Sequence, residues 1–197
     1  MSKRIPKSDF LEGLTLCEKN GLKFLSYSRK KLFNEEYLPA YIYGLISFEE
    51  FIKAYMILES WNDDFISRNK WENKMITHKE KLRLGAKLLY ESYKNVIEKL
   101  INEGTLPEQI INIDIIKRYD EKYVKEVLEN RTSFVYVNYN HNNNSWISTK
   151  DINPEKTSEL INASSSIWII LTIEKSKLNI NNINYEQYFK EINLFQT

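Results

Sequence analysis

The sequence predicts an all-α protein with one small extended segment, a β-hairpin near residues 133–148. Three observations support this fold class. Apolar residues recur at helical spacing through most of the first 130 residues. The stretch from Tyr41 to Leu58 has thirteen apolar residues among its eighteen, as expected of a helix that is covered on nearly every side. Residues 133–139, SFVYVNY, instead alternate as a strand does and are rich in β-branched and aromatic residues.

The first helix is expected to follow Ser8 or Asp9, because either side chain can accept a hydrogen bond from the free N–H groups of a first helical turn. It is expected to run to about Leu32. The apolar residues that support it are spaced for one helical face: Phe10, Leu14, Cys17, Leu22 and Leu25.

Two long helices are expected next. One covers about residues 34–59 and tolerates Pro39 in its opening turns, where a missing N–H breaks no hydrogen bond. The other covers about residues 66–103, either unbroken or with a break near Thr77. Gly104 is expected to end it, because glycine readily adopts the left-handed conformation that follows many helices.

The rest of the chain is expected to add shorter elements around the hairpin. Residues 105–131 have the spacing of one or two further helices. A helix over residues 154–177 is expected because Asn153 can cap it and Pro154 suits its first turn. A last short helix is expected over residues 184–194.

Size and composition favour one domain over residues 1–197, with a core over about residues 8–177. The charges nearly cancel, 28 basic against 27 acidic residues, so any surface for nucleic acid or an anionic membrane must be local. Cys17 has no second cysteine to pair with, which fits a reducing cytoplasm. No apolar run reaches the roughly 20 residues of a membrane-spanning helix, and no export signal is evident. A cytoplasmic protein without membrane contact is expected.

Few residues suit a cofactor, a metal or a nucleophilic enzyme. The chain has five glycines and no phosphate-cradling glycine loop, and its two histidines are too few for a common Cys/His zinc site. Cys17 has no histidine near it in the sequence, and no Gly-x-Ser-x-Gly motif is present. We therefore expect no cofactor and no metal.

Two adjacent carboxylates and a lysine lie in the middle of the apolar second helix. Lys53 follows Glu49 by four positions and Glu50 by three, so on a helix it can reach either carboxylate. Because a buried charge must be paired or hydrogen-bonded, one interpretation is a structural ion pair. The other is a polar cluster at a bundle centre or dimer contact that also positions a functional surface. A di-metal site with Glu-x-x-His spacing is disfavoured, because a lysine stands at the histidine position.

His78 has the helical spacing of an inward-facing stripe, so it is either a packed core residue or a ligand or base. The other members of that stripe are Trp71, Met75, Leu82 and Leu89. Residues 68–87 also carry seven basic and two acidic residues, which form either a solvated helix face or a surface for phosphates. The basic residues expected to contact RNA or another partner are Arg68, Lys74, Lys79, Lys81 and Arg83.

Three short elements, in this order and spacing, resemble a known family. They are E-E-x-x-K at Glu49, Glu50 and Lys53, H-K-x-K at His78, Lys79 and Lys81, and the segment from Arg131 through Tyr136 and Val137 to Trp146. Over roughly residues 10–175 the chain is similar to the AbiV family of bacterial abortive-infection proteins, which is placed in the HEPN superfamily.

The resemblance implies a HEPN-like helical bundle, usually a homodimer, that serves in phage defence by shutting down growth or translation of the infected cell. Many HEPN proteins are metal-independent ribonucleases with a histidine four to six residues after an arginine. Here nine residues separate Arg68 from His78, and nine separate Arg131 from His141. Neither pair has the family spacing, so enzymatic activity stays open, with a composite catalytic site of His78 and Arg131 as the remaining route.

Three hypotheses remain open. The first is an abortive-infection effector that binds a phage protein or a component of the translation machinery. The second is a HEPN-type ribonuclease with a non-standard site built from His78, Arg131 and the basic stripe. The third is a helical interaction module unrelated to phage.

Overall fold

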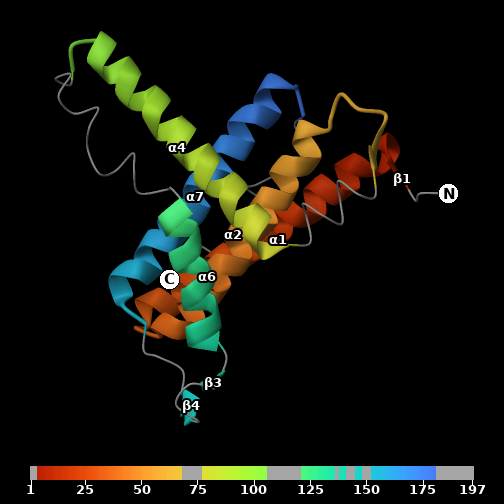
Figure 1. The fold of residues 1–197 in the computed structure, drawn as a ribbon. Coiled ribbons are helices and arrows are strands. Elements are labelled where there is room, and N and C mark those ends of the chain that lie inside the picture. Colours follow the sequence, from red (N-terminus) through yellow and green to blue (C-terminus); the bar gives the residue numbers. More distant parts are fainter. Residues whose placement is uncertain are drawn as a thin grey trace. The chain divides into compact units, whose positions relative to one another are not determined.

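The computed structural model describes residues 4–67, 77–105, 121–135, 138–140, 145–147 and 152–180. In these ranges the protein is helical apart from two short antiparallel strand pairs (Figure 1), so the predicted fold class is confirmed. The helices are α1 (Phe10–Phe33), α2 (Tyr37–Glu59), α4 (His78–Asn102), α6 (Glu121–Val135) and α7 (Pro154–Lys177). The strands are β1 (Arg4–Pro6), β2 (Phe65–Ser67), β3 (Asn138–Asn140) and β4 (Ser145–Ile147), and a short 3₁₀ turn, η1 (Lys7–Asp9), joins β1 to α1.

The chain divides into two compact units. The first contains residues 1–77 and 151–197, and therefore α1, α2, α7 and the β1–β2 pair. The second contains residues 78–150, with α4, α6 and the β3–β4 hairpin.

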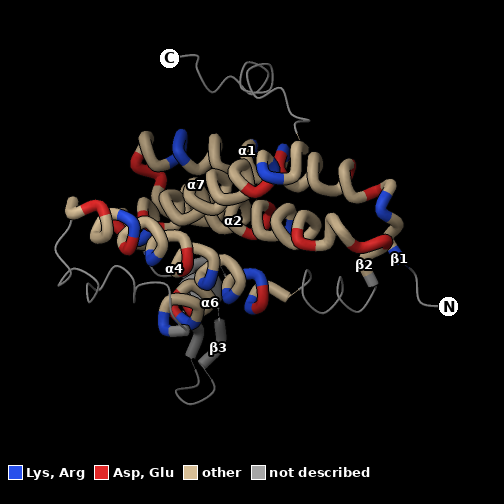
Figure 2. The backbone as a smooth tube through the Cα atoms, turned by 90° about the horizontal axis from the view of Figure 1, so that it is seen from above, with Lys and Arg blue, Asp and Glu red and all other residues tan. Residues whose placement is uncertain are grey.

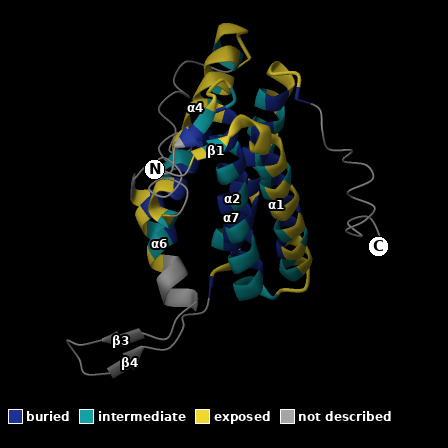
Figure 3. Cartoon of the chain, turned by 90° about the vertical axis from the view of Figure 1, so that its right-hand side faces the viewer, coloured by how far each residue is buried: buried dark blue, intermediate teal, exposed yellow. Residues whose placement is uncertain are grey.

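Three long helices form the core of the first unit. α2 packs against both α1 and α7, and buried residues occupy much of α2 and the inner side of α1 (Figure 3). This explains why α2 is apolar on almost every side, since it has a helix on two flanks. The largest side chains of these three helices that are fully buried are Phe10, Leu14, Leu22, Tyr41, Phe48, Phe51, Ile52, Ile57 and Leu160.

Contacts between side chains give the directions of α1 and α7. Glu18 of α1 contacts Lys175 near the end of α7, whereas Arg29, later in α1, donates a hydrogen bond to Ser165, earlier in α7. Residue numbers rise along one helix as they fall along the other. α1 and α7 are therefore antiparallel.

Small residues allow the three helices to approach closely. Ser47 Oγ of α2 donates to the carbonyl of Gly21 at 2.8 Å and lies 2.7 Å from Ser164 Oγ of α7. Because the single proton of Ser47 is committed to that carbonyl, the Ser164 hydroxyl donates to Ser47. Gly44 also lies against α7, where a Cβ would meet Ile161 Cγ1 at 3.3 Å. Gly44 lies against Ile161 and Ser47 lies against Ser164, so residue numbers rise in the same direction along both helices. α2 and α7 are therefore parallel.

Local signals set two helix ends as the sequence predicts, whereas the expected side-chain cap of α1 is not formed, because Asp9 precedes the helix without a capping hydrogen bond from its side chain. Asn153 Oδ1 accepts a hydrogen bond from the Glu155 N–H at 2.7 Å, and Pro154 is the first residue of α7, which confirms the expected helix over residues 154–177. Gly104 follows α4 with φ of 69°, the left-handed conformation expected of it. The helix expected over residues 184–194 lies outside the described residues.

The helix expected over residues 66–103 is wrong at residues 66 and 67, whereas the expected break near Thr77 is confirmed. Phe65–Ser67 form β2, which pairs antiparallel with β1 so that Ile66 lies opposite Ile5. Thr77 is not helical, and α4 begins at His78. Ile66 is buried in the strand pair, and one buried apolar residue fits a helical stripe as well as it fits a strand. Residues 68–76 lie outside the described part of the chain.

The second unit pairs α4 with α6 and ends in the hairpin. β3 pairs antiparallel with β4, with Tyr139 opposite Trp146, so the expected hairpin is confirmed. Its first strand begins at Asn138 and not at residue 133, because residues 133–135 form the last turn of α6. The helical spacing of the preceding buried residues, Tyr123, Val124 and Val127, extends the helix into the alternating stretch.

Candidate functional site

The polar trio of α2 lies on its middle turns. Glu49 is 7% exposed and has the helical spacing of the buried residues Leu45, Ile52 and Met56. Lys53 Nζ donates a hydrogen bond to Glu50 Oε1 three positions earlier, and both side chains are only partly exposed. The structure therefore brings Glu50 and Lys53 together as an ion pair, and it places Glu49 on a buried face of the same helix.

His78 is the first residue of α4 and is half-buried. Its helical neighbours Leu82, Gly85 and Leu89 are buried, so His78 lies at the beginning of the face that α4 turns inward. That face matches the predicted stripe over the residues that the structure describes. Trp71 and Met75, its other predicted members, fall outside them.

Of the basic residues expected to contact RNA, the structure describes Lys79, Lys81 and Arg83, and these differ in exposure. Lys79 is exposed, whereas Lys81 is buried at 5%. Arg83 donates to Glu80 Oε1 at 3.0 Å, so part of its charge is neutralised on the helix itself. Arg68 and Lys74 lie outside the described residues.

Arg131 lies in α6, in the same unit as His78. Its side chain is outside the part of the chain that the structure describes, so no geometry joins it to the His78 imidazole. His141 also lies outside the described residues. The composite catalytic site of His78 and Arg131 stays a prediction.

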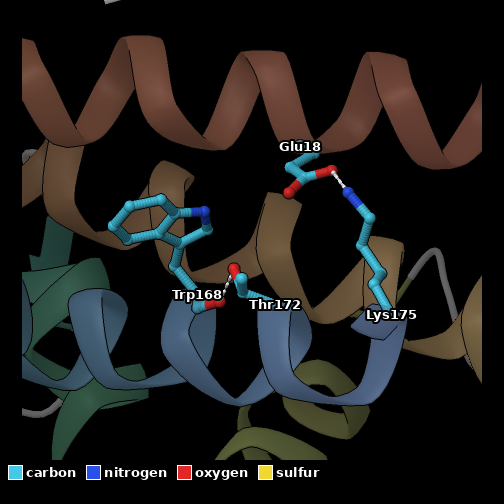
Figure 4. A network of polar contacts seen from close by, with 4 residues as sticks. All are labelled: Glu18, Trp168, Thr172 and Lys175. Carbon is cyan, nitrogen blue, oxygen red and sulfur yellow. Dashed lines mark hydrogen bonds and ion pairs between the residues drawn. The ribbon is translucent and has the colours of Figure 1, made fainter. Parts of the chain in front are cut away.

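An ion pair that the sequence patterns do not predict crosses the core of the first unit. Glu18 Oε2 of α1 lies 2.6 Å from Lys175 Nζ of α7, and the two side chains are 0% and 5% exposed. Figure 4 shows them pointing toward each other, with the indole of Trp168 on the same side of α7 as Lys175. The Thr172 hydroxyl donates to the Trp168 carbonyl at 2.9 Å within α7.

Glu18, and not Cys17, lies on the buried face of α1. The expected core face includes Cys17, but this residue is only half-buried and Glu18 lies inside. Glu18 is four positions from both Leu14 and Leu22, so its helical spacing fits the core face better than that of Cys17. The spacing of Glu18, and the equal four-residue interval from Leu171 to Lys175, each indicate a residue on a buried helix face, but neither identifies the partner.

Aromatic and basic residues gather where α1 lies beside α2. The rings of Phe24 and Tyr43 are stacked with centroids 6.0 Å apart, and Tyr27 meets both rings edge-on. Lys23 Nζ lies 6.0 Å from the Phe24 centroid and 5.9 Å from the Tyr27 centroid. No local sequence pattern predicts this group, because it forms only when the α1–α2 hairpin brings Tyr43 beside α1.

Neither a metal centre nor a membrane-spanning helix is found in the described part of the chain. Within the described residues no group of three or more His, Cys, Asp or Glu side chains is arranged to hold a metal ion. Over the same ranges no helix combines the length and apolar character needed to cross a membrane. Comparisons of the chain with models of protein families, with curated proteins and with solved structures found no match.

Proposed function

We propose that the protein is an abortive-infection effector that acts in the cytoplasm by binding a phage protein or a component of the host translation machinery. The proposal rests on the resemblance to the AbiV family at the E-E-x-x-K, H-K-x-K and Arg131-to-Trp146 elements. One structural observation supports it above others. Glu49, Glu50 and Lys53 belong to the central helix of a helical core, with Glu49 buried and the other two paired.

Binding is proposed in preference to RNA cleavage because the arginine–histidine spacing of HEPN ribonucleases is absent from the chain. His78 lies half-buried at the start of α4, and Lys81 of the same element is buried, which leaves less of this region available to a substrate. The alternative is a ribonuclease with His78 and Arg131 as catalytic residues, and the experiments below distinguish it from a binding protein.

A homodimer forms part of the proposal, and the outer side of α7 supports it. Ile169 and Ile173, one helical turn apart, are each about half exposed, at 54% and 51%. Residues 162–173 contain no charged residue, so two copies of this surface can meet without like-charge repulsion. A surface that is complementary to itself is what a two-fold dimer requires.

The proposal is tested by expressing the gene in a bacterial host and measuring plaque formation for a panel of phages. Protection should appear as fewer plaques together with growth arrest of infected cells before phage release. The control is the same gene with an early stop codon. Equal plaque numbers with both genes, for phages that infect the host productively, would contradict the proposal. They would favour the alternative of a helical interaction module unrelated to phage.

The same assay separates binding from cleavage. His78→Ala and Arg131→Ala proteins that fold normally are expected to keep protection, and total RNA from infected cells should stay intact. If both variants lose protection together with an RNA cleavage that the unchanged protein produces, the ribonuclease alternative is correct. Ile173→Arg should lower the mass of the purified protein from dimer to monomer in light scattering, which tests self-association independently.

A further inference from the structure

The second half of α1 is strongly basic although the whole protein is nearly neutral. Residues 19–34 contain five basic residues and no acidic residue. They are Lys19, Lys23, Arg29, Lys30 and Lys31. Figure 2 shows Lys and Arg positions along α1. This local charge is the kind of surface that a balanced overall composition leaves possible.

Several of these residues share one exposed face. Lys19, Lys23, Tyr27 and Lys30 follow one another at intervals of three or four positions, which places them on a single side of the helix. All four are exposed, and Figure 3 shows exposed residues along the outer side of α1. Phe33 follows Lys30 by three positions. We call Lys19, Lys23, Tyr27, Lys30 and Phe33 the α1 platform.

Two aromatic side chains of the α1 platform are open to solvent. Tyr27 is 41% exposed and Phe33 is 88% exposed. A phenylalanine this exposed gains nothing from the core, so its ring is available to a partner. Tyr27 is held from behind, because its ring meets Phe24 and Tyr43 edge-on and these two are stacked on each other. The ring is therefore positioned before any ligand arrives, which lowers the entropy lost on binding.

The lysines of the α1 platform are placed beside these rings. Lys23 Nζ lies near the rings of Phe24 and Tyr27. Within the residues that the structure describes, neither Lys23 nor Lys30 forms an ion pair. From Lys19 to Lys30 the platform spans about 16 Å along the helix axis. Cations that alternate with exposed rings over this length match a chain in which phosphates alternate with flat bases.

We propose that the α1 platform binds single-stranded nucleic acid, with Lys23 and Lys30 contacting phosphates and Tyr27 and Phe33 stacking on bases. A single strand fits better than a duplex, because the bases of a duplex are stacked on one another and do not offer their faces. It fits better than an acidic protein segment, because carboxylates would use the lysines and leave both rings without a role. The inference goes beyond the proposed function, and RNA binding in vitro does not depend on phage defence.

The test uses the purified full chain and fluorescence anisotropy with a labelled twelve-nucleotide uridine oligomer, the matching deoxythymidine oligomer and an RNA duplex of the same length. Both single strands should bind more tightly than the duplex, and a difference between them identifies RNA or DNA as the preferred source. Lys23→Gln/Lys30→Gln should weaken binding and reduce the dependence of log K on log salt concentration by about 0.7 for each phosphate that a lysine no longer neutralises.

Replacing rings tests stacking separately from charge. Tyr27→Leu and Phe33→Leu should each weaken binding roughly fivefold or more, because stacking of a base on an aromatic ring contributes about 1–3 kcal/mol. Tyr27→Phe, which keeps the ring, should bind like the unchanged protein. Tyr90, exposed at 39% on α4, provides a matched control, since Tyr90→Leu should leave affinity unchanged.

A control for the effect of charge also comes from α4. Lys94→Gln/Lys99→Gln removes two exposed lysines and should have little effect on binding. The proposal is wrong if Tyr27→Leu and Phe33→Leu bind normally, if the duplex binds as tightly as the single strands, or if polyglutamate displaces the oligomer at equal charge concentration. It is also wrong if Lys79→Gln/Arg83→Gln abolishes binding while the α1 variants do not. Thermal unfolding by circular dichroism verifies that each variant is folded.

Discussion

Glu18 and Lys175 form a buried ion pair that joins the antiparallel helices α1 and α7, with 2.6 Å between Oε2 and Nζ. The two residues are 157 positions apart in the sequence. Removing both charges from water is costly, so the pair contributes less net stability than its short distance suggests. Its clearest physical effect is on specificity, because sliding α7 by one turn would separate the two charges inside an apolar core. We infer that the pair fixes the register of α7 against α1.

Lys175→Met is therefore expected to lower the free energy of unfolding by about 3–5 kcal/mol, because it leaves the Glu18 carboxylate buried without its cation. Urea unfolding followed by circular dichroism measures this change. Lys177→Met is the matched control, since Lys177 pairs with Glu174 at the surface of the same helix. It should lose less than about 1 kcal/mol.

The double variant Glu18→Leu/Lys175→Met tests the reason for that loss. Removing both charges should restore most of the stability, because apolar side chains of similar size often replace a buried ion pair without penalty. If the double variant loses as much free energy of unfolding as the two single variants lose together, the loss comes from packing and not from a buried charge whose partner was removed.

The ion pair between Lys53 and Glu50 should have an intermediate value. Their side chains are 25% and 14% exposed, so water screens this pair more than it screens Glu18 and Lys175. Lys53→Met should therefore lower the free energy of unfolding by an amount between two limits. The loss should exceed that for an exposed pair, about 1 kcal/mol, and stay below that for a buried pair, about 3–5 kcal/mol. Lys87→Met, whose partner Glu91 is exposed, is the control in the same urea titration. A loss equal to that of the control would place Glu50 effectively in solvent.

The parts of the fold that depend on neighbouring residues could be predicted from the sequence. The start of α7 follows from Asn153 and Pro154, and the apolar stretch of α2 predicts a helix that is covered on most sides. The β1–β2 pair could not be predicted because it joins residues 4–6 to residues 65–67, and no local pattern states which strand another will meet. A three-residue strand is also too short to show alternation.

The candidate site divides in the same way. Contact between Lys53 and Glu50 depends on one helix and could be predicted from their spacing. The Glu18–Lys175 pair depends on how two distant helices pack, and charge alone does not reveal which acidic residue lies inside. Tyr27 likewise meets Tyr43 only because two helices fold back on each other. The spacing of residues in a single sequence indicates which face of a helix is buried, but it does not indicate which other helix packs against that face.

Among the glycines of α1 and α2, Gly21 has the least room for an added Cβ. A Cβ on Gly21 would overlap the ring of Phe51, which is itself fully buried. Gly21→Ala should therefore lower the free energy of unfolding by about 1–3 kcal/mol, although alanine is the better helix former. Gly13→Ala is the comparison, since a Cβ there would lie 3.3 Å from Ile57 Cδ1 and needs only a small adjustment.

Combining Gly21→Ala with Phe51→Leu tests the overlap directly. The smaller side chain makes room for the new methyl group, so the double variant should lose less than the sum of the two single losses in thermal or urea unfolding. Additive losses would show that the Phe51 ring moves aside without strain in the single variant.

In the turn between α1 and α2, Lys31 Nζ donates a hydrogen bond to Glu36 Oε2 at 2.6 Å. The hydrogen bond from Lys31 lowers the pKa of Glu36 below its ordinary value of 4.5; desolvation opposes this, and the Lys31 charge and a hydrogen bond from Asn34 reinforce it. Because the folded protein holds a proton on Glu36 less tightly than the unfolded chain, the interaction stabilises the fold above pH 4.5. This stabilisation is lost as the pH falls through the lower folded value.

Lys31→Gln should therefore raise the pKa of Glu36 toward 4.5, as measured by NMR titration of its side-chain carboxyl carbon. The variant should be less stable than the unchanged protein at neutral pH, and the difference should disappear in acid once Glu36 is protonated in both proteins. Lys30→Gln removes an equal charge from the adjacent position and should leave the Glu36 titration nearly unchanged, because the hydrogen bond from Lys31 remains. Equal shifts in the two variants would mean that the general positive charge of α1, and not the contact with Lys31, lowers the pKa of Glu36.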